Sequence, residues 1–166
     1  MKFHISRVMS DSLIRKKSFR FLNYVVATGL GAGFSPLAPG TAGSLITVIV
    51  VYFLSPIPVW IYISGLVFLF VIGVYSGTVV EKERGEDPSI VVIDEIVGMG
   101  ISLLFLARDW RFYLVAFVLF RFFDIAKPPP INRSQKLPGG YGIMMDDVLA
   151  GFYALILSHV IVYIIF

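Results

Sequence analysis

The feature that most restricts the fold is a run of 24 residues without a charged side chain, Ile57 to Val80. About 20 apolar residues are enough for a helix to cross the hydrocarbon core of a bilayer. Further apolar runs occupy residues 21–33, 42–54, 90–107 and 112–125, and a last run ends at Phe166. The chain is 15% charged, where an ordinary soluble domain is about 25% charged. The sequence therefore predicts an all-α, polytopic membrane protein with about five hydrophobic helices, four or five of which span the membrane.

The distribution of basic residues predicts the orientation. Six of the fourteen Lys and Arg residues lie in residues 1–20. We interpret this segment as a basic cytoplasmic amino-terminal arm, either a helix on the headgroup layer or a mobile tail, ahead of a single helical membrane domain in residues 21–166. With five crossings, eleven of the fourteen fall in inner segments and two in outer segments, as the positive-inside rule requires.

The segment from residue 29 to residue 44 interrupts the first apolar run. It holds five glycines and two prolines, which a regular helix does not accommodate. We expect a short or re-entrant first helix, an irregular loop, and a new helix that starts near Thr41, with Thr41 or Ser44 near its cap. Such a helix start can bind phosphate through backbone N–H groups and hydroxyls, although close packing of small residues would explain the glycines equally well.

Five carboxylates fall at the ends of apolar runs that this topology places on the cytoplasmic side: Asp94, Glu95, Asp124, Asp146 and Asp147. An ionisable group at the centre of a span costs roughly 2.5–3.5 kcal/mol, and five acids in one layer repel one another, so we expect a cation among them. The chain has no cysteine, and oxygen ligands favour Mg²⁺, Mn²⁺ or Ca²⁺. Adjacent acids on a helix point about 100° apart, so we expect one acid of each adjacent pair to face a given ion.

Arg121, Asp124 and Lys127 have the spacing i, i+3, i+6, which places them on one helix face. One interpretation is a phosphate clamp beside a catalytic or metal-binding acid. The other is an Arg121–Asp124 ion pair, with Lys127 extending to the lipid headgroups. Three glycines near the acids, Gly98, Gly100 and Gly151, predict close helix packing.

Four motifs together resemble the phosphatidylglycerophosphatase A family. They are Gly-x-Gly-x-x-Pro-x-x-Pro-Gly-Thr-x-Gly-Ser at 31–44, Asp-Glu-Ile-Val-Gly-Met at 94–99, Phe-Arg-Phe-Phe-Asp-Ile-Ala-Lys-Pro-Pro-Pro-Ile at 120–131, and Gly-Gly-x-Gly-Ile-Met-x-Asp-Asp-x-x-Ala-Gly at 139–151. The resemblance implies an all-helical Mg²⁺-dependent phosphatase of the bacterial inner membrane. Its reaction would remove the terminal phosphate of phosphatidylglycerophosphate to give phosphatidylglycerol.

On this hypothesis the site faces the cytoplasm, the partners are an anionic phospholipid substrate and membrane lipids, and no nucleic acid is involved. Either water attacks phosphorus, or an aspartate such as Asp124 attacks first. A small ion or solute transporter is the alternative, since intramembrane acids also mark ion pathways, and a metal-binding subunit without turnover is a third possibility. The proposed roles are catalysis for Asp94, Asp124 and Asp147, substrate binding for Thr41, Ser44, Arg121 and Lys127, and Mg²⁺ binding for Asp94, Glu95, Asp146 and Asp147.

Overall fold

The computed structural model of the protein describes residues 2–54 and 56–165, with side chains from residue 15 onward. Helices and loops make up these described residues, with no strand among them, so the all-α prediction is confirmed. The elements in chain order are α1 (Lys2–Ala27), the 3₁₀ turn η1 (Ala32–Phe34), α2 (Pro39–Leu54), α3 (Val59–Arg84), α4 (Ile93–Ser102), α5 (Trp110–Ala126), α6 (Ile131–Ser134) and α7 (Gly140–Ile165).

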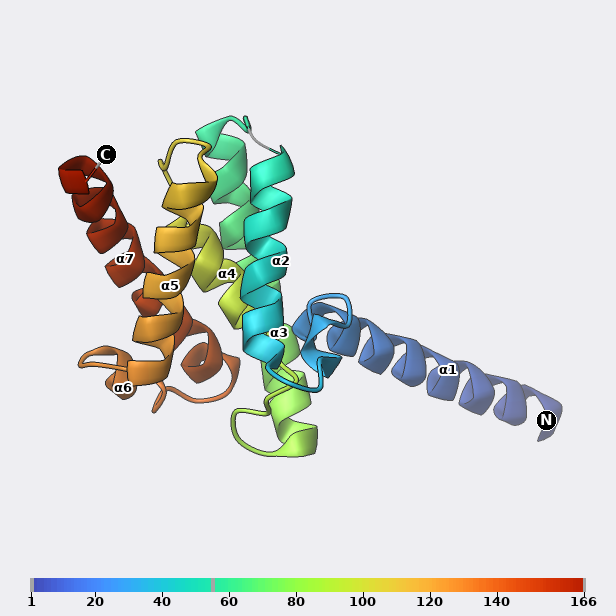
Figure 1. Ribbon diagram of the computed structural model, residues 1–166. Coiled ribbons are helices and arrows are strands. Elements are labelled where there is room, and N and C mark those ends of the chain that lie inside the picture. The colour runs from blue at the N-terminus through green and yellow to red at the C-terminus, as the bar shows by residue number, and fades with distance from the viewer. Residues whose placement is uncertain (1, 55, 166) are drawn as a thin grey trace.

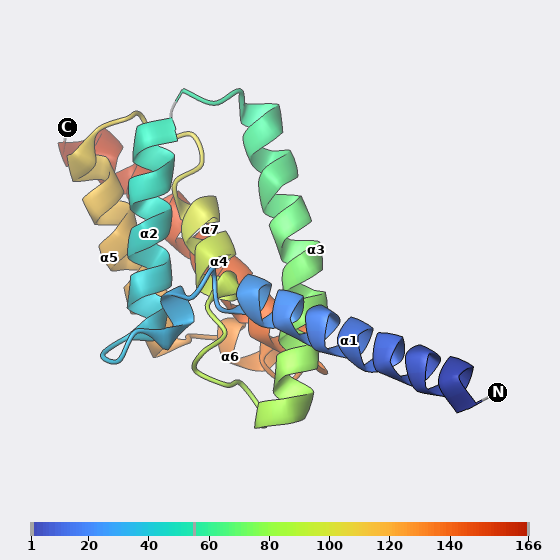
Figure 2. The same ribbon diagram turned by 90° about the vertical axis from the view of Figure 1, so that its right-hand side faces the viewer.

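Helix α4 lies at the centre of a bundle formed by α2, α3, α5 and α7 (Figures 1 and 2). Its most extensive contacts are with α7, and it also packs against α2, α3 and α5. Nearly all of its residues are buried, including the acidic Asp94. The chain runs along the bundle in alternating directions through α2, α3, α4, α5 and α7 (Figure 1), which is the order of directions that the sequence predicts.

Helix α4 is shorter than the predicted helix over residues 90–107. It comprises ten residues, which is about 15 Å of helix, half the thickness of a bilayer core. The helix ends because its last turn tightens: the Ser102 hydroxyl donates to the Met99 carbonyl (2.7 Å), and the Leu103 amide donates to the Gly100 carbonyl (3.3 Å). A loop with buried Leu103 and Leu104 then continues toward α5.

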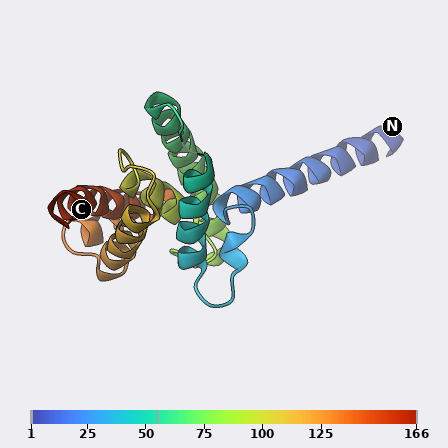
Figure 3. The same ribbon diagram turned by 45° about the horizontal axis from the view of Figure 1, so that its top comes forward.

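The first helix also differs from the prediction. The basic arm and the first apolar run form the single helix α1, which is 26 residues long and projects sideways from the bundle (Figures 1 and 3). It is therefore not the short helix that we expected. The predicted break does follow it, since Gly29, Leu30 and Gly31 all have positive φ angles, the conformation that commonly ends a helix. Helix α2 then starts at Pro39, two residues before Thr41.

Two helices, α3 and α7, are long and apolar enough to cross a membrane, and α2 is a shorter apolar helix. Large apolar side chains on α3 and α7 are exposed, among them Phe68, Val71, Ile156 and Ile164. An exposed apolar surface of this kind suits contact with lipid. These helices indicate membrane association, and the count of four to five spans stays a prediction.

The glycines near the acids allow α4 and α7 to touch through their backbones. A Cβ atom at Gly98 would lie 2.5 Å from the Asp147 carbonyl oxygen, and one at Gly151 would overlap the Gly98 carbonyl oxygen. A Cβ atom at Gly100 would lie 2.5 Å from the Leu66 side chain. The prediction of close helix packing is therefore confirmed, and this contact fixes the position of Asp147 relative to α4.

Candidate active site

The helix ends that carry the candidate site residues meet at one end of the bundle, the lower end in Figure 1. Helices α2, α4 and α7 begin there and α5 ends there (Figures 1 and 2). Asp94 and Glu95 occupy the first turn of α4. Asp146 and Asp147 lie further inside than the sequence suggested, because α7 begins at Gly140 and its first turn contains no acid. The second aspartate is thus about 10 Å along the helix from its start.

Three carboxylates form the centre of the site. One oxygen from each of Asp94, Glu95 and Asp147 lies within 4.8 Å of the other two. Asp94 is 7% exposed and Asp147 is 2% exposed. In each of these carboxylates one buried oxygen has no hydrogen-bond partner among the described residues: Asp94 Oδ1, Glu95 Oε2 and Asp147 Oδ2. Converging carboxylate oxygens without a donor fit a hard divalent cation such as Mg²⁺.

The two adjacent acidic pairs behave differently. Both Asp94 and Glu95 belong to the three-carboxylate cluster, although we expected one acid of each pair to face an ion. The longer Glu95 side chain has the reach to overcome the 100° rotation between neighbours on a helix. In the second pair the expected divergence occurs, since only Asp147 joins the cluster. Asp146 Oδ2 instead accepts a hydrogen bond from Lys127 Nζ at 2.6 Å.

Lys127 therefore does not extend away from the protein, as one interpretation of the sequence had it. Its side chain is 26% exposed and forms an ion pair with Asp146. Partial burial lowers the pKa of Lys127, but the hydrogen bond and charge of Asp146 outweigh that effect, so the pKa is raised overall. The lysine stays positively charged beside the carboxylate cluster.

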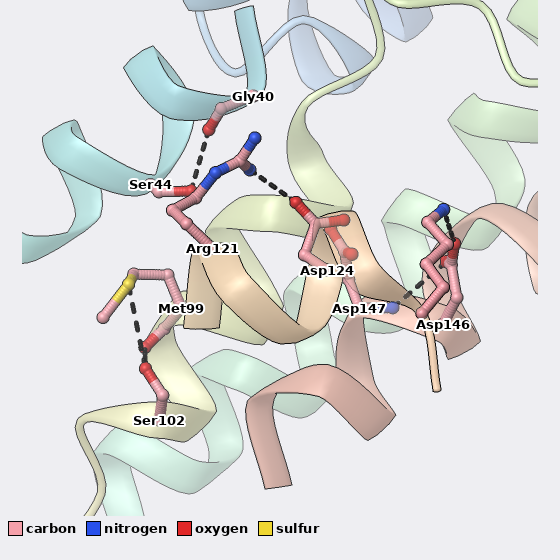
Figure 4. Close-up of polar contacts among 9 residues, drawn as sticks. Gly40, Ser44, Met99, Ser102, Arg121, Asp124, Asp146 and Asp147 are labelled. Atoms are coloured by element: carbon pink, nitrogen blue, oxygen red, sulfur yellow. Dashed lines mark hydrogen bonds and ion pairs between the residues drawn. The ribbon is translucent and has the colours of Figure 1, made fainter. Parts of the chain in front are cut away.

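Arg121 and Asp124 form an ion pair, with 2.6 Å between Nη1 and Oδ2. Their side chains are 18% and 12% exposed. Figure 4 shows the Arg121 guanidinium directed toward Asp124, which lies beside Asp147. Arg121 Nε is buried and has no hydrogen-bond partner among the described residues. Arg121 thus forms the predicted ion pair with Asp124. Its Nε also remains available to donate to a phosphate oxygen, as the phosphate-clamp interpretation requires.

The start of α2 lies against this cluster. Thr41 is in the first turn of α2, and the buried Ser44 donates to the Gly40 carbonyl at 2.8 Å (Figure 4). Neither residue is the N-cap, because α2 begins at Pro39. A Cβ atom at Gly40 would overlap Glu95 Oε1 and would lie 3.1 Å from Arg121 Nη1. Sequence reasoning missed Gly40, although a glycine directly after a helix-starting proline is a detectable sign of a close contact.

A cavity of about 580 Å³ approaches the site from the side of Asp146. The end of α3, the loop after α6 and the start of α7 line it, through residues such as Glu81, Gln135 and Lys136. Asp94, Glu95 and Asp147 are not among its lining residues. This cavity therefore reaches Asp146 and not the three-carboxylate cluster.

Comparison with known proteins decides the family. The family model described as phosphatidylglycerophosphatase A matches residues 25–162. The chain belongs to the phosphatidylglycerophosphatase A family. All four sequence motifs lie within the matched residues, and the resemblance drawn from them is confirmed.

Named relatives cover most of this family member. It is 41% identical over 153 residues to phosphatidylglycerophosphatase A of Haemophilus influenzae (89% of this chain, 94% of the relative). It is 38% identical over 131 residues to phosphatidylglycerophosphatase A of Escherichia coli K12 (77% of this chain, 76% of the relative). A Bacteroides thetaiotaomicron protein named "Putative phosphatidylinositol-3-phosphatase" is 46% identical over 148 residues (84% of this chain, 93% of the relative). No solved structure matches.

Membership of the phosphatidylglycerophosphatase A family makes this chain an enzyme, a phosphoric monoester hydrolase. The family and the two long apolar helices both indicate association with membranes. The transporter alternative receives no support from the comparisons. A transporter would have acids spread through the membrane depth, whereas Asp94, Glu95 and Asp147 gather in a single cluster.

Proposed function

We propose that this member of the phosphatidylglycerophosphatase A family hydrolyses the terminal phosphomonoester of phosphatidylglycerophosphate in a Mg²⁺-dependent reaction. The products are phosphatidylglycerol and phosphate. The observation that carries the proposal is the cluster of three carboxylates, Asp94, Glu95 and Asp147, each with a buried oxygen that lacks a hydrogen-bond partner among the described residues. A cation-binding cluster beside the partly buried Arg121 suits a dianionic phosphomonoester.

The Mg²⁺ ligands in this proposal are Asp94, Glu95 and Asp147, with Asp146 held next to them by Lys127. When bound, Mg²⁺ would offset the charge of the phosphomonoester and polarise its phosphorus–oxygen bonds. Arg121 contributes the buried Nε donor and Lys127 a positive charge. The first turn of α2, which contains Thr41 and precedes Ser44, places the positive end of a helix against Glu95.

The chemical step transfers the phosphoryl group to water. In one form, the oxygen of water bonds to phosphorus while the bond from phosphorus to the glycerol oxygen breaks, and the glycerol oxygen takes up a proton. In the other, an Asp124 carboxylate oxygen bonds to phosphorus while the bond from phosphorus to the glycerol oxygen breaks and that oxygen takes up a proton. Water then hydrolyses the aspartyl-phosphate, which releases phosphate and restores the carboxylate. The position of Asp124 beside Asp147, where it pairs with Arg121, supports either role (Figure 4). Rapid quench with a phosphate-labelled substrate distinguishes them, since only the second form leaves label on the protein.

A second candidate substrate is phosphatidylinositol 3-phosphate. The supporting observation is the 46% identity to the Bacteroides thetaiotaomicron relative that carries this activity in its name. Both lipids present a phosphomonoester on a hydroxylated headgroup, so the same carboxylates and Arg121 would serve both. The value of kcat/KM for each lipid, measured side by side, ranks the two candidates.

The proposed location is the bacterial inner membrane, with the amino terminus and the site on the cytoplasmic side. Support comes from the basic residues, eleven of which lie in segments at the expected inner side. The site lies at the end of the bundle from which α1 projects (Figure 1). An inward-facing site suits a lipid phosphate made in the cytoplasmic leaflet.

Phosphate release by the purified protein from phosphatidylglycerophosphate, with Mg²⁺ and with a chelator, tests the proposal. We expect release only with Mg²⁺, and no release in either condition would contradict the enzyme function. Asp147→Asn should abolish turnover and leave the fold intact, because it removes one charge from the cluster without changing its shape. Asp109→Asn is the matched control, since Asp109 caps α5 at its other end and asparagine caps equally well. Near-normal turnover in Asp147→Asn would exclude a direct role for that carboxylate.

A further inference from the structure

A second cavity, of about 520 Å³, lies between α1, the loop at residues 28–34 and the end of α3. Three basic side chains line it: Lys17, Arg20 and Arg84. None of the site carboxylates is among its lining residues. The cavity is therefore separate from the acidic site and has the opposite charge.

Tyr24 organises the basic side of this cavity. The guanidinium of Arg20 lies 5.8 Å from the centre of the Tyr24 ring, and that of Arg84 lies 5.6 Å from it. The Tyr24 hydroxyl donates to Glu83 Oε2 at 2.8 Å, and Arg20 Nε pairs with the same oxygen at 2.9 Å. Glu83 thus fixes the geometry and offsets one of three positive charges. The cavity wall stays net positive.

The remaining wall of the cavity is apolar and open to the outside. Phe21, Leu30 and Phe34 line it and are 71%, 88% and 61% exposed. Leu30 is held there with a positive φ of 57°, which is uncommon for a residue other than glycine. A small polar anion would use the basic groups and leave this apolar surface in contact with water. An amphiphile with a negative headgroup would use both.

We propose that this cavity binds an anionic phospholipid. Its headgroup phosphate lies at Lys17, Arg20 and Arg84, and its acyl chains lie against Phe21, Leu30 and Phe34. The charge complementarity of the basic wall selects an anionic lipid over a zwitterionic one, and the exposed apolar wall selects a lipid over free phosphate. The proposal does not depend on the proposed function, because it needs neither Mg²⁺ nor turnover.

The bound lipid would contact segments that pack against α4, the helix that carries Asp94 and Glu95. The Ala27 carbonyl at the end of α1 accepts a hydrogen bond from the Val92 amide at 2.9 Å, directly before α4. A Cβ atom at Gly29 would lie 2.6 Å from the Ile96 side chain. The loop that forms one wall of the cavity therefore packs on the first turns of α4. A ligand that binds only the folded arrangement of these segments raises the unfolding temperature.

Native mass spectrometry of the full chain in an uncharged detergent, with EDTA present, measures this binding directly. The probe is short-chain phosphatidylserine, which is not a product of the proposed reaction, and EDTA leaves the acidic site repulsive to anions. Phosphatidylcholine with the same chains and inorganic phosphate are the comparison ligands. We expect binding of phosphatidylserine, weaker binding of phosphatidylcholine, and no displacement by millimolar phosphate. Equal binding of both lipids, or displacement by phosphate, would overturn the proposal.

The variants Lys17→Ala/Arg20→Ala and Arg15→Ala/Lys16→Ala form a matched pair. Each removes one lysine and one arginine from exposed positions of α1, and only the first removes residues that line the cavity. Each basic group near an anionic lipid contributes roughly a factor of five, so the first variant should bind about thirtyfold more weakly and the second about as well as the wild type. If both variants lost phosphatidylserine binding equally, the overall charge of α1 would explain the effect, and binding in the cavity would be refuted.

The variant Phe21→Ala tests the apolar contact separately, because Phe21 is exposed and its truncation leaves the basic groups in place. We expect weaker binding of phosphatidylserine in this variant and a loss that does not change with salt concentration, unlike the loss in the basic variant. Unchanged binding in Phe21→Ala would contradict the acyl-chain contact. Asp147→Asn should bind phosphatidylserine as the wild type does, which separates this test from that of the proposed function.

Discussion

The contact between α4 and α7 makes Gly98→Ala the most informative single substitution. A Cβ atom at residue 98 would lie 2.5 Å from the Asp147 carbonyl oxygen and 2.6 Å from Phe120 Cε2. Ordinary contact begins at 3.4 Å, so the two helices must separate by about 0.9 Å at this point. Neither neighbour yields easily, because one is backbone and the Phe120 side chain is fully buried. The separation would move Asp147 away from Asp94 and Glu95.

Two magnitudes follow from that displacement. Overpacking of a well-packed core costs typically 1–3 kcal/mol, and this cost exceeds the roughly 1 kcal/mol that alanine gains over glycine inside a helix. We therefore expect lower stability. Misplacement of a catalytic group by about 1 Å can reduce the rate roughly a hundredfold. We expect the loss of activity to be larger than the loss of stability would explain.

The assay compares Gly98→Ala with Gly65→Ala. Gly65 also lies inside a helix, but nothing lies within 4 Å of a Cβ atom placed there. Thermal unfolding in detergent and phosphate release at saturating Mg²⁺ are measured for both. The Gly65 variant should unfold at the wild-type temperature or slightly above it and keep full activity. If Gly98→Ala matched the wild type in both measurements, the backbone contact between α4 and α7 would not be what positions Asp147.

Three further predictions concern other parts of the fold. Thr78→Val should lower the free energy of unfolding by about 1–3 kcal/mol, because the Gly140 amide at the start of α7 loses its acceptor, the Thr78 hydroxyl at 2.8 Å; an unchanged unfolding temperature would contradict this. Removal of Mg²⁺ should lower the unfolding temperature of the wild type but not that of Asp147→Asn, since saturation at a hundred times Kd stabilises by about 2.7 kcal/mol; equal shifts in both would place the ion elsewhere. Hydrogen bonds from Arg111 lower the pKa of Asp109, so its contribution to stability is present above the pKa of the unfolded chain and is lost as the pH falls through the folded pKa; Asp109→Asn should flatten the acid side of a stability–pH profile.

The sequence could predict that the site residues gather at one end of the bundle, because this follows from the alternating direction of successive apolar helices. Successive apolar runs cross in opposite directions, so the start of one run and the end of the next lie at the same end of the bundle. Acids at these positions are therefore brought together. In the structure Asp94 and Asp147 share the three-carboxylate cluster, and Asp124 lies beside Asp147 (Figure 4). No knowledge of helix packing was needed for this inference.

Element boundaries could not be predicted in the same way. Hydropathy does not register the end of α4, because Leu103 and Leu104 remain apolar and buried in the loop that follows. At α1, composition suggested a boundary that does not exist. The residues change from basic to apolar near Phe21, but the helix continues through this change. Lysine, arginine and leucine all favour helices. A shift in polarity along a chain marks a change of environment, and backbone structure can continue through it.

Asp146 and Asp147 have different partners because of tertiary contacts, which the spacing of residues in the sequence does not reveal. Lys127 ends α5 in a left-handed conformation with φ of 44°, which precedes Pro128 and redirects the chain. From this position its ammonium group reaches Asp146 across 19 residues of sequence. Asp147 is left to face Asp94 and Glu95. Only the packing of α5 on α7 decides which of the two adjacent acids is neutralised by the lysine.

The fold itself offsets only part of the repulsion within the carboxylate cluster. Asp94 and Glu95 lie in the first turn of α4, and the first turn of α2 contacts Glu95 at Gly40. Each helix start stabilises an adjacent negative charge by about 0.3–1 kcal/mol, and up to ~2 kcal/mol where it is partly buried. A single carboxylate at the centre of a bilayer costs roughly 2.5–3.5 kcal/mol, and this cluster has three. Arg121 pairs with Asp124 and Lys127 with Asp146, so neither cation neutralises the cluster directly. A bound divalent cation would offset this remaining negative charge, and its open coordination positions would bind the phosphate.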